Sequence, residues 1–252
     1  MSDYQRTIDL DNLWPIIQSE AEQDALKQPL LSALLQRHIL QQPNFAAALA
    51  SILAEKLMDR GADHTQWQQA FYQLIQANPV IETAALRDLT CQLESNACIK
   101  DHYTPLLHFG GYQALQCHRL AHQYWQQDDQ AMACYIQGRV VSIYGVDIHP
   151  NVPMGAGIFM DHAVGIVIGE TAVVEDDVTL FQGVTLGGTG KGSGDRHPKL
   201  RQGAFVGSNA VILGNIEIGA EAKIAAGAAV VKPVAAGETV VGPIAKPFVP
   251  KA

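Results

Sequence analysis

The feature that most constrains this chain is an aliphatic residue that returns every six positions through its C-terminal half. Each six residues can form one short strand and one tight turn, and three such units close a triangular coil. The aliphatic residue points into the coil and stacks on its counterpart in the next coil. The repeat therefore predicts a parallel β-helix, with inward first positions at Ile148, Met154, Met160, Ile168, Val174, Leu180, Leu186, Leu200, Val206, Ile212, Ile218, Ile224 and Val230.

The fifth position of each repeat is small or β-branched, and we expect it to point inward too. The segment from Gly187 to Lys199 interrupts the repeat, and five of its thirteen residues are glycine. We therefore predict a loop that leaves the β-helix there, and loops of this kind often carry functional residues. The predicted fifth positions are Val152, Val164, Ala172, Val178, Val184, Ala204, Ala210, Ala222, Ala228 and Val234.

The N-terminal half has a helical pattern, rich in Gln, Ala and Leu and poor in Gly. Asn44 is a candidate N-cap of a helix that we expect to end at Gly61. Asn78-Pro79 and Thr104-Pro105 each open a further helix, because proline is favoured in the first turn. The second of these is expected to continue to Leu120. The predicted fold class is α+β, with a helical domain, a β-helix catalytic domain and a short tail at 1–138, 139–246 and 247–252.

Composition narrows the class of protein. The net charge of −8 argues against a nucleic-acid-binding protein. The polar, acidic N-terminus lacks the pattern of a secretory signal, and no apolar run is long enough for a membrane span, so we expect a cytoplasmic protein without a membrane role. The four cysteines lie outside any zinc-ligand spacing and are expected to be free thiols: Cys91, Cys98, Cys117 and Cys134.

Three Asp/His clusters flank the glycine-rich loop or lie within it: Asp147-Ile148-His149-Pro150, Asp161-His162 and Asp195-Arg196-His197-Pro198. Asp147 and His162 are fifteen positions apart, so neighbouring coils can bring them to one corner of the prism. An Asp bonded to one ring nitrogen of a His leaves the other nitrogen free to accept a proton. This pattern predicts a general base for a substrate that supplies its own hydroxyl.

The loop also reverses the sign of the local charge. Lys191, Arg196, Lys199 and Arg201 lie within eleven residues, against the single acid Asp195. An arginine there can bind a carboxylate through two hydrogen bonds. The amides of Gly187-Gly188 can approach a ligand carbonyl or a developing oxyanion closely, because glycine has no Cβ.

Together these motifs resemble the serine acetyltransferases of bacteria and plants. The resemblance covers most of the chain and is strongest from about residue 103 to 234. It is carried by VDIHP, by DHAVGIVIGET, by GGTGK and by DRHPK, and by TPLLHFGGYQALQCHRLAHQYW in the helical half. It implies a left-handed β-helix of hexapeptide repeats with an excursion loop, and transfer of acetyl from acetyl-CoA to the L-serine hydroxyl, in cysteine biosynthesis.

The resemblance also implies a role for individual residues. His162 would be the general base and Asp147 its support. The serine ammonium would be held by Asp161, and its carboxylate by Arg196 and His197. Residues implied for acetyl-CoA, which serves as co-substrate without a metal, are Gly188, Thr189, Ser208, Lys223, Ala226 and Lys246.

Members of this family are trimers or dimers of trimers with active sites between subunits, and L-cysteine commonly inhibits them. Two features of this chain depart from the family. Asn96 stands where members carry an Asp that reaches the amino acid, and an amide offers no charge to an ammonium. The chain also lacks the terminal Ile that inserts into O-acetylserine sulfhydrylase, so we expect no tight complex through that route.

Three alternatives stay open from the sequence. The chain could acetylate a related hydroxy amino acid such as homoserine, as Asn96 allows. A β-helix with His149, His162 and His197 could instead bind zinc, as a hydratase of the γ-carbonic-anhydrase kind does. The solenoid could also be a scaffold without enzyme activity.

Overall fold

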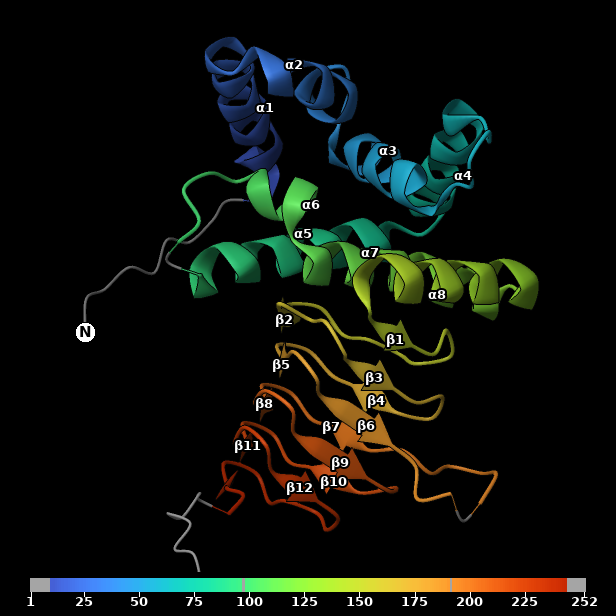
Figure 1. Cartoon of the computed structure of the whole chain (residues 1–252), viewed down its shortest axis with the longest axis vertical. Helices are drawn as coiled ribbons and strands as arrows, with labels where there is room; N and C mark the ends of the chain where they lie inside the picture. The colour runs from blue at the N-terminus through green and yellow to red at the C-terminus, as the bar shows by residue number, and fades with distance from the viewer. Residues whose placement is uncertain (1–9, 97, 191, 244–252) are drawn as a thin grey trace, which may run out of the picture.

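The computed structural model describes residues 10–96, 98–190 and 192–243. Figure 1 shows a helical half stacked on one end of a tapering stack of β-coils. No helix in this part of the chain is long and apolar enough to cross a membrane. The helices are α1 (Leu10–Lys27), α2 (Pro29–Leu35), the π-helix η1 (Gln36–Leu40), α3 (Phe45–Leu57), α4 (His64–Ala77), α5 (Pro79–Ser95), α6 (Thr104–His108), α7 (Gly110–Gln126) and α8 (Gln130–Tyr144).

The predicted helix starts are confirmed. The side chain of Asn44 accepts a hydrogen bond of 2.9 Å from the Ala47 N–H and caps α3, and α5 begins at Pro79. The predicted end of α3 at Gly61 is wrong. Met58 already has extended backbone with ψ 151°, and Gly61, at φ +87°, belongs to the turn that follows.

The helix predicted from Thr104 to Leu120 is interrupted, so that prediction is also wrong. Phe109 has ψ 110° and separates α6 from α7. The break lets the start of α7 lie directly on the first coil. A Cβ added at Gly111 would be 2.3 Å from the main-chain oxygen of Met160, so only glycine permits this approach.

The change from helices to strands comes later than the sequence suggested. α8 runs past residue 138 to Tyr144. Gly145 then ends it in the left-handed conformation, at φ +65°, with its N–H bonded to the oxygen of Val141. The first strand begins directly afterwards at Asp147.

The C-terminal half is a left-handed parallel β-helix, as predicted. In the described residues its strands form three parallel sheets, in the orders β1-β3-β6-β9-β12, β4-β7-β10 and β2-β5-β8-β11-β13. We call these faces A, B and C. The strands are β1 (Asp147–Ile148), β2 (Phe159–Asp161), β3 (Val167–Ile168), β4 (Val173–Val174), β5 (Thr179–Phe181), β6 (Thr185–Gly187), β7 (Lys199–Leu200), β8 (Phe205–Val206), β9 (Val211–Leu213), β10 (Glu217–Ile218), β11 (Lys223–Ile224), β12 (Ala229–Val230) and β13 (Thr239–Val240).

The inward positions of the repeat are confirmed with few exceptions. Twelve of the thirteen predicted first positions are buried, and Met154 is partly buried. Val164 was predicted to point inward, but it is 64% exposed. Ala163 and Ile166 are buried in its place. The reason is a tight turn at His162 and Ala163, both with positive φ, which shifts the register of this coil.

Candidate active site

His162 lies on the corner where the chain passes from face C to face A. It directly follows β2, and its side chain is 73% exposed, with Nε2 3.5 Å from Oδ2 of Asp161. His162 and Ala163 adopt the left-handed conformation in succession, at φ +56° and +63°. A non-glycine residue in this region costs about 1–3 kcal/mol, and such residues cluster at active sites and ligand contacts, although Asp177, Asn209 and Glu221 adopt it here in other turns. No feature of the sequence predicts this strain.

The same corner continues from coil to coil and carries other predicted residues. Main-chain hydrogen bonds join this corner in successive coils. The Asn209 N–H donates to the Gln182 oxygen at 2.9 Å, and the Gly227 N–H donates to the Ser208 oxygen at 2.8 Å. The Ser208 hydroxyl contacts the Gln182 side chain at 3.2 Å. We name this corner the His162 edge, and it comprises Asp161, His162, Gln182, Ser208 and Ala226. Sequence reasoning missed Gln182, although it occupies the repeat position equivalent to Ser208.

A second group of predicted residues lies on the corner between faces A and B, where the excursion loop leaves the coil. We name it the loop edge, and it comprises Gly188, Thr189, Arg196 and His197. Nη2 of Arg196 is 2.7 Å from Oε2 of Glu170, and Arg196 lowers the pKa of that carboxyl. His197 is buried and bonded to Thr171. Burial lowers the pKa of His197, and the positive charges of Arg196 and Lys199 lower it further.

The basic side chains of the excursion loop are paired with carboxylates to a greater extent than the sequence suggests. Lys199 Nζ is 2.6 Å from Asp195, and Arg201 is 2.7 Å from Glu175 and also pairs with Glu217. These pairs tie the loop to the coils. Lys191 lies outside the described residues. Arg196 remains suited to an anionic ligand, because its Glu170 partner lies at the protein surface, 37% exposed.

The two edges are separate within one chain. Face A lies between them, and no hydrogen bond or ion pair in residues 10–96, 98–190 and 192–243 joins the His162 edge to the loop edge. Asp147 lies on β1 of face A. Its Oδ1 accepts a hydrogen bond of 2.7 Å from Nε2 of Gln137 on α8, and within the same described ranges no hydrogen bond or ion pair links it to His162.

The remaining predicted residues lie apart from both edges or outside the described part of the chain. Asn96 follows the last residue of α5, and its side-chain oxygen accepts a hydrogen bond from Cys98 N–H at 3.1 Å. Lys223 lies on β11 of face C, just before the turn that holds Ala226. Lys246 and the predicted tail 247–252 lie outside the described residues.

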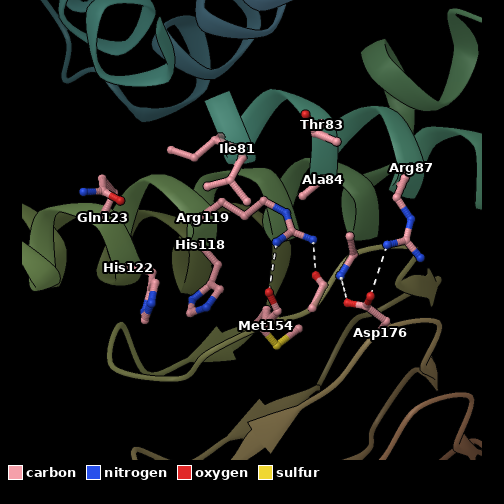
Figure 2. A pocket seen from close by; sticks show the side chains of 13 residues that line it. Ile81, Thr83, Ala84, Arg87, His118, Arg119, His122, Gln123, Met154 and Asp176 are labelled. Atoms are coloured by element: carbon pink, nitrogen blue, oxygen red, sulfur yellow. Dashed lines mark hydrogen bonds and ion pairs between the residues drawn. The ribbon is translucent and has the colours of Figure 1, made fainter. Parts of the chain in front are cut away.

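A cavity of about 340 Å³ lies elsewhere, between α5, α7 and the first coil (Figure 2). Several of its polar groups are bonded within the protein. Arg119 donates to the main-chain oxygens of Met154 and Gly155 at 3.2 and 2.6 Å, and Arg87 pairs with Asp176 at 3.1 Å. His118 donates from Nε2 to the Val152 oxygen at 3.0 Å, and burial lowers its pKa to about 3. These contacts clamp the helical half to the β-helix.

One cluster in the helical half has metal-ligand residue types. The ligand atoms of His38, Glu55 and His64 lie within 4.8 Å of one another. His38 is bonded through both ring nitrogens, to Ser51 Oγ and Glu55 Oε2, each at 2.9 Å. Arg37 lies 2.9 Å from the same oxygen of Glu55. A hydrogen-bonded polar cluster with its own cation explains this arrangement without a metal ion.

Comparisons with known proteins agree with this architecture. The serine acetyltransferase N-terminal family model matches residues 13–117, and a model of six bacterial transferase hexapeptide repeats matches residues 197–232. A serine acetyltransferase from Haemophilus influenzae is 41% identical over 92% of this chain and 86% of its own length.

Solved structures are similar in the same way. The serine acetyltransferase of Brucella abortus in complex with coenzyme A has a TM-score of 0.90 and 42% identity, over 95% of each chain. A serine acetyltransferase in complex with cysteine has a TM-score of 0.90 and 40% identity, over 95% of this chain and 99% of the other. Sequence and fold agree over nearly the whole length, and the chain therefore belongs to the serine acetyltransferase family.

Proposed function

We propose that this protein is a serine O-acetyltransferase, which transfers the acetyl group of acetyl-CoA to the hydroxyl of L-serine. The observation that carries this proposal is the His162 edge. It places an exposed histidine, held in a strained turn beside Asp161, at the head of a corner that continues through Ser208 and Ala226. An elongated thioester substrate can lie along such a corner with its acetyl group at the histidine.

The reaction is a direct transfer. His162 accepts the hydroxyl proton of serine while the serine oxygen attacks the carbonyl carbon of the thioester. The tetrahedral intermediate collapses, the carbon–sulfur bond breaks, and protonated His162 gives its proton to the departing thiolate. We assign to Asp147 the support of the positive charge on His162, which requires a bond between the two side chains that the described chain, with Asp147 bonded to Gln137, does not show. No acyl-enzyme intermediate forms, because the substrate hydroxyl itself is the nucleophile.

The two charged ends of serine are bound separately. Asp161 holds the ammonium, with Asn96 as a neutral hydrogen-bond partner, and Arg196 and His197 hold the carboxylate. Acetyl-CoA is bound by the amide of Gly188 and by Thr189, Ser208, Lys223, Ala226 and Lys246. L-Cysteine carries the same ammonium and carboxylate as serine, so it occupies the same site and acts as an inhibitor.

The separation of the two edges supports an oligomer that shares its active sites. The carboxylate-binding pair and His162 lie on different corners of one prism, with face A between them. A ring of copies brings the His162 edge of one chain against the loop edge of the next. We therefore propose a homotrimer, or a dimer of trimers joined through the helical half, in the cytoplasm.

Release of free thiol from acetyl-CoA tests the reaction. We expect thiol release that depends on L-serine and is slower with homoserine or threonine, because Arg196 and Asp161 must bind both ends of the amino acid at one distance from His162. A faster rate with homoserine would retain the chemistry and overturn the choice of substrate. Absence of release with any hydroxy amino acid would overturn the proposed function.

Co-expression of two variants tests the shared site. His162→Ala and Arg196→Ala chains should each form nearly inactive homo-oligomers. If each site takes one edge from each of two chains, random mixing should restore about one site in four over all oligomers, and about one site in three in purified trimers that contain both variants. The measurement is serine-dependent thiol release by purified hetero-oligomers carrying two different tags. Activity no higher than that of the separate variants would show that both edges of a site come from one chain.

A further inference from the structure

Thr171 lies beside His197 at the point where the excursion loop returns to the coil. It belongs to the turn between β3 and β4, and His197 lies two residues before the start of β7, which pairs with β4. No motif in the sequence assigned Thr171 a role. In the structure its main-chain N–H and its hydroxyl are bonded to Arg196 and His197, and its main-chain oxygen accepts a hydrogen bond of 2.8 Å from Nζ of Lys199.

The hydrogen bonds determine which nitrogen of His197 carries the proton. The main-chain N–H of Thr171 lies 3.2 Å from Nδ1 of His197, and a main-chain N–H can only donate. Nδ1 must therefore be the unprotonated, accepting nitrogen. In the neutral ring the proton then resides on Nε2.

The Thr171 hydroxyl reinforces this assignment. Its oxygen accepts hydrogen bonds from the main-chain N–H groups of Arg196 and His197, at 3.0 and 3.1 Å. Both acceptor positions are then occupied, so the hydroxyl can only donate, and its acceptors are Nδ1 of His197, at 2.8 Å, and the neighbouring Asp195 carboxylate. Asp195 is also bonded to Lys199 and Asn215, at 2.6 and 3.1 Å, and these bonds together with the Thr171 side chain lower the pKa of its carboxyl.

Two glycines form the slot in which the other side of the ring lies. A Cβ at Gly169 would be 2.1 Å from Nε2 of His197, and a Cβ at Gly188 would be 3.4 Å away. The protonated Nε2 thus faces the part of the loop edge where the Gly188 amide lies. Because burial also keeps the ring neutral, His197 can donate one hydrogen bond there without adding a charge to that of Arg196.

We infer that Thr171 is a positioning residue that holds His197 in its Nε2-protonated tautomer, so that His197 donates a hydrogen bond to the carboxylate of the amino-acid substrate. This inference rests on the proposed function for the identity of the ligand, but not for the tautomer. Arg196 supplies the charge for the carboxylate, and His197 supplies a directed neutral donor. The hydroxyl of Thr171 also ties both residues to the coil, so one side chain sets the geometry of the pair.

The test compares Thr171→Val, which has nearly the same shape without the hydroxyl, with Thr171→Ser, which keeps it. We expect Thr171→Val to raise the KM for L-serine about tenfold, the effect of losing about 1.4 kcal/mol, with the KM for acetyl-CoA unchanged. Thr171→Ser should stay within about twofold of the wild type. Thr239→Val, on the outer strand β13, is the matched control and should leave both constants unchanged.

A spectroscopic measurement is independent of activity. Magic-angle-spinning ¹⁵N NMR of the full-length protein labelled at histidine reports the protonated nitrogen of each ring, and the His197→Gln variant assigns the signal. We expect Nε2 protonation in the wild type and in Thr171→Ser, and a mixed or altered signal in Thr171→Val.

Each outcome bears on a separate claim. Protonation of Nδ1 in the wild type, or a Thr171→Val protein with unchanged tautomer and unchanged KM for serine, would overturn the inference. If the wild type shows the expected tautomer but acetylates no hydroxy amino acid, the proposed function fails while the role of Thr171 in holding the ring stands.

Discussion

Replacing His162 with alanine should reduce the kcat of acetyl transfer to serine by about 10²–10⁴, the usual contribution of a positioned general base. The variant should fold normally, because the His162 side chain is 73% exposed and its one ion-pair contact in the described chain is to the adjacent Asp161. The KM for acetyl-CoA should change little, since the imidazole acts on the serine hydroxyl. Steady-state thiol release with serine at saturation measures the effect.

A matched histidine variant separates this loss from a general effect. His108 is exposed at the end of α6 and is distant in sequence from the residues of both edges. His108→Ala should therefore keep the wild-type kcat. Circular dichroism should show the same helix content for both variants. Serine-dependent activity within a few-fold of wild type in His162→Ala would contradict the assignment of His162 as the base.

The second prediction with a large effect concerns protein stability. It involves the contact between the helical half and the β-helix. Asp88 on α5 is fully buried, and its Oδ2 accepts hydrogen bonds from Nε and Nη2 of Arg119, at 3.1 and 2.7 Å. The same oxygen accepts from Gln116, and Oδ1 accepts from the Ile158 N–H at 2.9 Å. Asp88→Ala leaves the buried guanidinium of Arg119 without its carboxylate partner. Such a loss costs about 3–5 kcal/mol, so the free energy of unfolding should fall by that amount.

Urea unfolding at one fixed protein concentration measures this change, since an oligomer's stability depends on concentration. Lys27→Ala is the control for the loss of an ion pair in general. Lys27 is exposed and pairs with Asp24 on the surface of α1, so its loss should cost less than about 1 kcal/mol. Equal stability losses in the two variants would show that the Asp88–Arg119 pair does not hold the halves together.

Much of the architecture could be predicted because it depends on local periodicity. A side chain that returns every six residues must face the same way in each coil, so the buried first positions follow from the sequence alone. Asn44 and Pro79 mark helix starts for an equally local reason, since each satisfies or removes a main-chain donor of its own first turn. The family motifs are short contiguous runs and could also be recognised without a structure.

The incorrect predictions concern positions where contact with a distant segment determines the local conformation. Gly111 looked like part of a continuous helix, but the main-chain oxygen of Met160 occupies the space where a Cβ would lie, and the chain breaks at Phe109 to fit. Val164 matched the repeat, yet the strained turn at His162 turns it outward.

The candidate site divides in the same way. The sequence by itself determined the β-helix, the position of the excursion loop and the residue types of the site, because spacing within a few residues carries that information. Only the tertiary structure separated the His162 edge from the loop edge and revealed the bond between Thr171 and His197. Partners twenty or more positions apart meet because successive coils stack, and the length of each coil depends on its turns and insertions, which no fixed period specifies.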